Sequence, residues 1–214
     1  MYSQEGYTAK KEFGYNNRVK SVKTYTMNVG RYTIPTDTID YFHKSILKFT
    51  IKGDILTHYQ FMNQPSYKYK SIIKYTGVGK NLYYTEDLHI NDTLKSLNKF
   101  KYDWINDFEY NIKSELKSEI RSVTLNNDFT VKTVVLIDEE FQSTEHATYY
   151  YNNDVLDYIV FENITIKNNI SESRSTKHEV KSVDVYNNPT VIYVYKNLHI
   201  RVPSTVILKY YEYY

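Results

Sequence analysis

The longest regular pattern of apolar and polar residues lies at residues 91–121. Large apolar side chains recur there in steps of three or four, with one step of seven, at Leu94, Leu97, Trp104, Phe108, Ile112, Leu116 and Ile120. This spacing puts them on one face of a helix, with Lys, Asp and Glu opposite. Asn91 or Asp92 can cap the first turn, and Arg121 suits the negative end of the helix dipole. The pattern predicts one long helix at residues 91–121.

Short apolar stretches separated by turn residues make up the rest of the chain. Residues 45–51 and 55–61 flank Gly53 and Asp54, which predicts a hairpin with a tight turn. Three Asn-containing trios, at residues 126–128, 152–154 and 187–189, are predicted tips of further hairpins, because Asn and Asp tolerate left-handed backbone.

Three other segments complete this interpretation. Residues 69–75 and 205–211 are predicted strands, and the polar residues 168–178 are an expected exposed loop. Hairpins without regular strand–helix alternation favour a mainly β fold. We expect an antiparallel β-sandwich of about eight to ten strands with the long helix near residues 91–121. Residues 1–17 form a predicted N-terminal assembly arm, and residues 18–214 a single sandwich domain.

Composition narrows the possible functions. Lys plus Arg number 27 against 25 Asp plus Glu, and there is no cysteine. The balanced charge lacks the basic excess typical of a nucleic-acid binder, and the missing cysteines exclude disulfides and thiolate chemistry. No signal peptide or apolar stretch long enough for a membrane-spanning helix is evident, so we expect no membrane association and a cytosolic site of synthesis.

Catalytic signatures are absent from the sequence pattern. The six histidines are scattered singly, without the spacing of a zinc site. The densest acidic cluster, residues 138–140 with Glu145 and His146, can hold a cation or act as a general acid and base, although a solvated loop explains it equally well. We expect no enzyme activity, no catalytic residue, no cofactor and no metal.

Tyrosine is the unusual feature of the composition. The chain has 25 Tyr, 9 Phe and 1 Trp. Tyr packs like an aromatic while its hydroxyl is satisfied at a wet boundary, which favours contact surfaces. Because Tyr and Lys both titrate near about pH 10, an assembly held by such contacts is expected to be stable at neutral pH and to dissolve in alkali. The two tails supply the predicted intermolecular contacts: Tyr2, Tyr7, Phe13, Tyr15, Tyr210, Tyr211, Tyr213 and Tyr214.

One short segment resembles a known family. Residues 13–17, Phe-Gly-Tyr-Asn-Asn, run directly into the predicted strand at residues 18–25, and this junction is similar to that of the cypovirus polyhedrins. The resemblance covers about 15 residues and implies a tyrosine-rich β-sandwich with an N-terminal arm. That family's projecting helix is N-terminal, whereas the helix predicted here is in the middle of the chain.

The resemblance implies a structural, self-assembling protein. It would form the crystalline matrix of a viral occlusion body in the cytoplasm of an infected host cell, with copies of itself in a trimer-based lattice and virus particles as partners. Two alternatives stay open on sequence grounds: a β pore-forming toxin of aerolysin-like type, and a carbohydrate-binding β-sandwich. Liposome leakage would identify the first alternative, and glycan binding the second.

Overall fold

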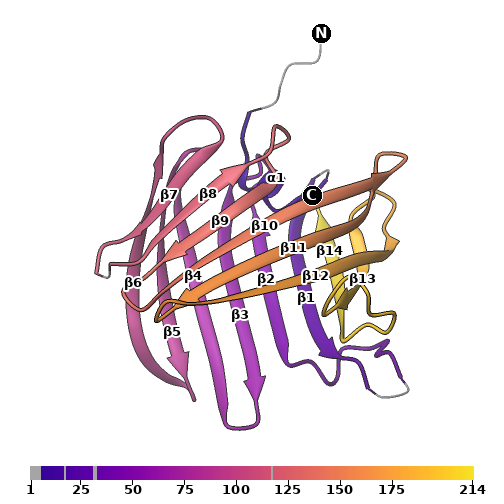
Figure 1. Cartoon of the computed structure of the whole chain (residues 1–214). Helices are drawn as coiled ribbons and strands as arrows, with labels where there is room; N and C mark the ends of the chain where they lie inside the picture. Colours follow the sequence, from indigo (N-terminus) through magenta and orange to yellow (C-terminus); the bar gives the residue numbers. More distant parts are fainter. Residues whose placement is uncertain (1–5, 17, 31–32, 117) are drawn as a thin grey trace.

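The protein is a closed, up-and-down antiparallel barrel of fourteen strands (Figure 1). The computed structural model describes residues 6–16, 18–30, 33–116 and 118–214. Every strand pairs with its neighbours in sequence, and pairing of β1 with β14 closes the barrel. The strands are β1 (Val19–Asn28), β2 (His43–Phe49), β3 (Ile55–Gln64), β4 (Tyr67–Val78), β5 (Asn81–Ile90), β6 (Thr93–Trp104), β7 (Glu109–Ser114), β8 (Ile120–Leu125), β9 (Val131–Ile137), β10 (Phe141–Asn152), β11 (Val155–Lys167), β12 (Ile170–Val183), β13 (Pro189–Tyr195) and β14 (Thr205–Tyr213).

The predicted helix at residues 91–121 is wrong. This stretch forms β6, β7 and the start of β8. Asn91 and Asp92, interpreted as helix caps, have φ values of 50° and 62° and form the tight turn between β5 and β6. The helical stripe mixes both faces of the strands: Leu94 and Leu97 are more than half exposed. Among the described residues, no helix has the length and apolar character needed to cross a bilayer.

The sandwich prediction is also wrong, since one closed sheet replaces two stacked ones. Several of its hairpins are nevertheless confirmed. β2 pairs with β3 around Gly53, and the three Asn-containing trios lie between β8 and β9, β10 and β11, and β12 and β13. The expected loop at residues 168–178 is instead a two-residue turn, Asn168 and Asn169, followed by β12.

Side chains alternate between the barrel interior and its outer face. On β2, Ser45, Leu47 and Phe49 are buried, whereas Lys48 is exposed. Most of the buried apolar side chains fill one end of the barrel, in two adjoining clusters built around Phe49 and Tyr110. A third, smaller cluster around Met27 lies on the opposite face of β1 and β14 and packs against Tyr41.

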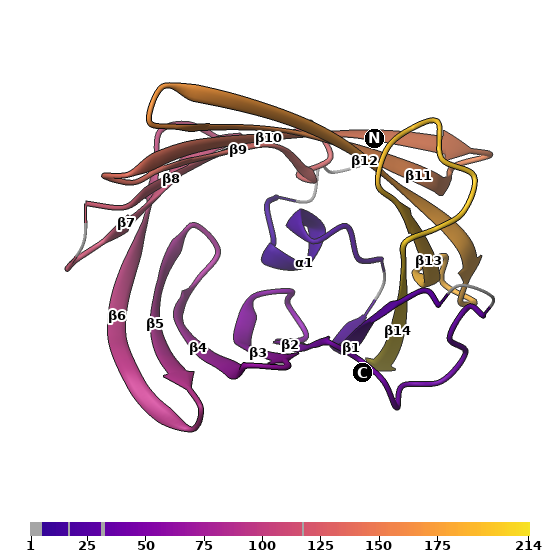
Figure 2. The same ribbon diagram turned by 60° about the horizontal axis from the view of Figure 1, so that its bottom comes forward.

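The N-terminal segment occupies the filled end of the barrel. Residues 7–16 enter the ring of strands, and their short helix α1 (Ala9–Glu12) lies inside it (Figure 2). Thr8 caps this helix by accepting a hydrogen bond from the Lys11 amide at 3.3 Å. The amide of Lys10 donates to the carbonyl of Gly53 at the tip of the β2–β3 hairpin. The segment predicted to reach other chains thus contacts its own barrel; we call residues 7–16 the plug.

Candidate functional site

The plug brings a carboxylate into the barrel interior. Glu12, at the end of α1, accepts hydrogen bonds from the phenols of Tyr7 and Tyr110, each at 2.6 Å. Tyr7 belongs to the plug and Tyr110 to β7, so Glu12 joins the plug to the wall. The ring of Tyr7 also packs edge-on against Trp104 at 4.7 Å and against Phe129 at 6.1 Å.

Burial is the main cause of the pKa shifts of Glu12, Tyr7 and Tyr110. It raises the pKa of Glu12, and the hydrogen bonds from Tyr110 and Tyr7 offset only part of that rise. Burial, followed by the charge of Glu12, raises the pKa of both phenols far above the usual value. Both tyrosines are therefore held as neutral donors at every physiological pH, which suits them to an acceptor carboxylate.

A cavity of about 430 Å³ lies beneath the plug. Glu12 and Phe13 form its roof, and β3 to β11 contribute its walls. Phe13 keeps 39% of its surface exposed. Most of its lining side chains are aromatic or aliphatic: Ile73, Tyr75, Tyr84, Tyr102, Tyr110, Ile112, Val123, Val131, Val134 and Leu136.

Six polar side chains complete the lining of the cavity. They are His58, Gln60, Arg121, Ser143, Glu145 and Asn163. Burial lowers the pKa of His58 to about 4, with a further contribution from His43, so His58 is neutral at neutral pH. Burial raises the pKa of Glu145. The site thus combines aromatic walls, one guanidinium and carboxyl groups, which is the usual make-up of a small-molecule site.

A second hollow, of about 470 Å³, lies at the rim between the plug and the wall. Lys11 and Asn16 of the plug line it together with Asp128, Tyr149 and Asp154 of the wall. Asn188 fastens this side of the plug, since its side-chain oxygen accepts a hydrogen bond from the Asn16 amide at 2.8 Å. Plug residues, hairpin tips and the ends of β10 and β11 line the rim hollow, whereas the cavity beneath the plug is walled mainly by strands.

The tail residues predicted as intermolecular contacts have diverse positions. Tyr7 and Tyr15 lie inside the barrel, and Tyr15 is only 8% exposed. At the other end of the chain, Tyr211 and Tyr213 pack against the plug-end cluster. Phe13, Tyr210 and Tyr214 keep between 39% and 50% of their surface exposed, and Tyr2 lies outside the described residues. Contact with other chains stays a prediction for this set.

The structure separates the acidic cluster recognised in the sequence. Residues 138–140 lie at the β9–β10 turn, while Glu145 and His146 point to opposite faces of β10. Glu145 faces the cavity, and His146 lies on the outer face, where it contacts Thr133 at 2.9 Å. Within the described ranges, no three His, Asp or Glu side chains come close enough to share a metal ion. Among these five residues, only Glu145 lines the cavity beneath the plug.

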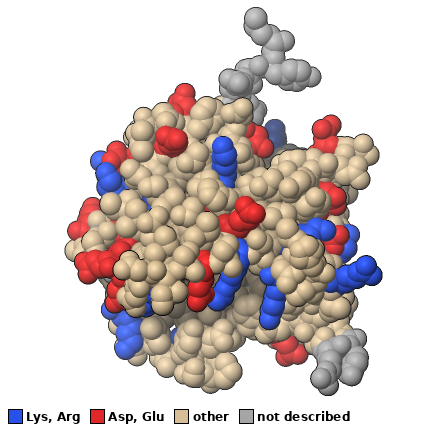
Figure 3. Space-filling model, in the orientation of Figure 1, with Lys and Arg blue, Asp and Glu red and all other residues tan. Residues whose placement is uncertain are grey.

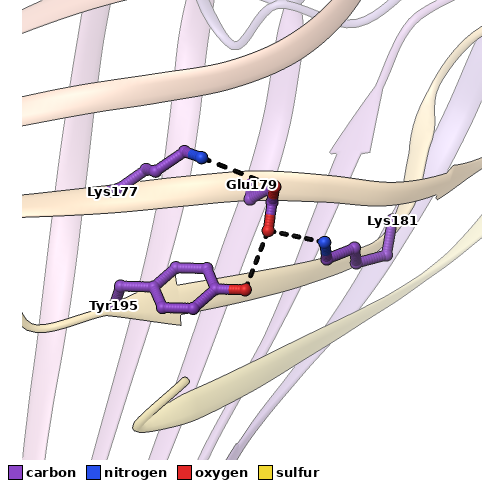
Figure 4. A network of polar contacts seen from close by, with 4 residues as sticks. All are labelled: Lys177, Glu179, Lys181 and Tyr195. Carbon is purple, nitrogen blue, oxygen red and sulfur yellow. Dashed lines mark hydrogen bonds and ion pairs between the residues drawn. The ribbon is translucent and has the colours of Figure 1, made fainter. Parts of the chain in front are cut away.

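The most connected polar group on the outer face is a network around Glu179 (Figure 4). Its carboxylate contacts Lys177 at 3.4 Å and Lys181 at 2.6 Å and accepts a hydrogen bond from Tyr195 at 2.8 Å. Burial raises the pKa of Glu179, but these partners outweigh it and hold the pKa below its usual value. The network thus links β12 to β13 on the outer face of the barrel.

Comparisons with protein-family models, curated proteins and solved structures give no match to this chain. Its candidate site therefore rests on the geometry described above.

Proposed function

We propose that the protein is a binding protein that holds a small organic molecule in the cavity beneath the plug. The observation that carries this proposal is the cavity of about 430 Å³ walled by tyrosine rings and edged by Glu145 and Arg121. Ligand sites of this kind are concave and mostly apolar, with a few convergent polar groups. Barrels wider than the smallest ones commonly enclose such a cavity.

The outer face of the barrel supports a binding protein over a pore-forming toxin. A lipid-facing barrel carries a continuous apolar band on its outside. Here charged residues interrupt the apolar ones, such as Tyr83 and Leu97, on the outer face of β4, β5 and β6. The charged outward residues are Lys68, Lys70, Lys74, Asp87, Lys99, Lys101 and Asp103. Figure 3 shows basic and acidic side chains interspersed over the opposite strands as well.

Self-assembly into a crystalline matrix stays a separate hypothesis. One ground for this hypothesis is an N-terminal arm that needs another chain to order it. The plug supplies a different explanation for residues 7–16, because Glu12, Tyr7 and Tyr15 find their partners within the same chain. These contacts hold the plug over the cavity in which we propose that the ligand binds. We therefore prefer the binding function to self-assembly.

The test is a binding screen of a cavity-filling variant and a matched control. Val134 lines the cavity, and the next residue, Val135, faces outward on the same strand. A library of small aromatic and alkyl compounds, including cations, neutral molecules and anions, would be screened by thermal shift. Trp104, the only tryptophan, reports hits by fluorescence because its ring lies 4.6 Å from that of Tyr110 in the cavity wall.

We expect at least one compound class to bind the wild type and Val135→Phe saturably, and Val134→Phe to lose that binding while keeping the circular dichroism of the fold. The proposal is overturned if no compound binds the wild type. It is equally overturned if the two Phe variants bind the same compounds equally well.

A further inference from the structure

The charged groups of the cavity are unequally satisfied. Glu12 accepts two phenol hydrogen bonds, and Arg121 has Glu119 at 3.7 Å. His58 is neutral at neutral pH, since its pKa is lowered to about 4. Glu145 is the exception: among the described residues, nothing donates a hydrogen bond to its carboxylate or pairs with it. The cavity therefore has one carboxyl group available for a ligand.

The neighbours of Glu145 explain why it has no partner. Across the sheet it is flanked by Val134 on β9 and Asn163 on β11. Val134 offers no donor, and the Asn163 amide donates instead to Ser143 at 3.1 Å. The side-chain oxygen of Asn163 in turn accepts from Thr165 at 2.9 Å. Asn163 is thus hydrogen-bonded to Ser143 and Thr165 and not to Glu145, whose carboxylate faces the cavity.

Tyrosine rings form the wall nearer the plug. Tyr84 stacks on Phe100 at 4.5 Å and contacts Tyr75 at 5.3 Å, and Tyr102 lies 5.1 Å from Tyr110. Aromatic rings pack well against an aromatic or alkyl group, so this part of the wall suits the organic body of a ligand. The same cavity thus offers a carboxylate for a positive charge and aromatic rings for an organic body.

We propose that the ligand is a small organic cation, an amine or ammonium ion with an aromatic or alkyl body, whose charge is bound by Glu145. This inference rests on the proposed binding function and adds the chemical class. The ammonium supplies the donor that Glu145 lacks, and the organic body packs against Tyr84 and the aliphatic residues near the plug. Glu119 neutralises Arg121 in part, which weakens the competing attraction for an anion.

If Glu145 binds the cation, cation binding and proton binding at Glu145 are coupled, and this coupling can be measured. Glu145 faces Val134 and Asn163 from the adjacent strands, with His58, Arg121 and Glu12 elsewhere on the cavity wall. Burial favours the neutral form of Glu145 in the empty cavity, whereas a bound cation favours the carboxylate. Binding should therefore release a proton in the range where Glu145 titrates, and amine affinity should rise with pH across it.

The experiment compares three probes of similar size by isothermal titration calorimetry: 2-phenylethylamine, the neutral 2-phenylethanol and the anion 3-phenylpropanoate. Each is titrated into the wild type, Glu145→Gln and Glu162→Gln. Glu162 is a matched control, because it is an exposed carboxylate paired with His146 on the outer face of the neighbouring strand.

We expect the amine to bind the wild type at least about tenfold more tightly than the alcohol, a difference of about 1.4 kcal/mol. Glu145→Gln should remove that advantage and leave the alcohol unaffected, while Glu162→Gln should change neither. Equal binding of all three probes, or retained amine preference in Glu145→Gln, would overturn the cation assignment and leave the binding function standing. If none of the three probes binds and the library screen gives no hit, both the cation assignment and the binding function are overturned.

Discussion

The contacts that Glu12 makes in the barrel are not evident from the sequence. In the sequence it is an ordinary acidic residue in a polar stretch. In the structure it accepts two short phenol hydrogen bonds and forms part of the cavity roof. Nothing in the local pattern predicts this, since Tyr110 is 98 positions away in the chain. Glu145 differs, because it belongs to an acidic cluster that is visible in the sequence. Alternation along β10 turns its side chain away from that of His146.

Removing one phenol tests the Glu12 contact. Tyr110→Phe deletes a hydrogen bond to a carboxylate at a side chain that is 1% exposed. Hydrogen bonds to charged groups contribute about 1.5–3 kcal/mol, so the free energy of unfolding in urea should fall by about 2 kcal/mol. Tyr210→Phe is the control: Tyr210 is 50% exposed, and its substitution should change stability by less than about 0.5 kcal/mol. Equal effects would show that the Glu12 contact is not stabilising.

At the scale of elements, turn chemistry was more informative than periodicity. The Asn-rich trios correctly located three hairpins, because residues such as Asn153 and Asp154 adopt positive φ angles at the tips. The same chemistry at Asn91 and Asp92 also suits a helix cap, because apolar residues downstream recur at helical spacing. The inward residues of β6, Asn98, Phe100, Tyr102 and Trp104, do alternate, but charged residues between them suited either interpretation.

Two glycines at the β4–β5 hairpin give a matched test of turn geometry. Gly77 has a φ of 98°, and an added Cβ would lie 1.8 Å from the carbonyl oxygen of Asn81. Gly79 has a φ of 55° and nothing within 4 Å of that position. Gly77→Ala should therefore lower the free energy of unfolding by about 3 kcal/mol or more, and Gly79→Ala by about 1 kcal/mol. Thermal or urea unfolding measures both, and similar losses would contradict this geometry.

At the scale of the whole molecule, barrel closure depends on pairing between the first and last strands. Hydrophobic alternation and hairpin tips specify sequential neighbours, but they do not say whether a sheet closes or folds into two layers. Closure requires β1 and β14, some 190 residues apart, to pair in register, as Ser21 and Glu212 do. The sequence therefore predicted a hairpin-rich β protein correctly and its architecture wrongly.

An engineered disulfide tests that closure. The chain has no cysteine, and Lys23 on β1 faces Tyr210 on β14 at the surface. Antiparallel partners lie about 4.5–5.5 Å apart, within disulfide range. The double variant Lys23→Cys/Tyr210→Cys should form an intramolecular bond on mild oxidation. Lys23→Cys/Lys101→Cys, with the second cysteine on β6, should not; bonding there, or none in the first variant, would contradict the closed barrel.

Buried phenols make the fold sensitive to alkali. Burial raises the pKa of the tyrosines around the plug and cavity, so the folded chain keeps protons that the unfolded chain releases above about pH 10. The free energy of unfolding should therefore be highest below that pH and fall above it. The tyrosines concerned are Tyr7, Tyr75, Tyr84, Tyr102, Tyr110, Tyr149, Tyr211 and Tyr213.

Tyrosinate absorbance and circular dichroism, followed together in an alkaline titration, measure this coupling. Part of the absorbance change should come in one step that coincides with loss of β structure. Complete tyrosine ionisation with the fold intact would contradict the burial described here. This effect is internal to one chain and needs no assembly.

The central claim is that a small organic cation occupies the cavity beneath the plug, and a crystal structure with 2-phenylethylamine tests it most directly. We predict the ammonium within hydrogen-bonding distance of the Glu145 carboxylate and the phenyl ring against the tyrosine wall that includes Tyr84. Electron density for the amine in the rim hollow beside Lys11 and Asp128, or only on the outer face, with solvent alone in the cavity, would contradict the account.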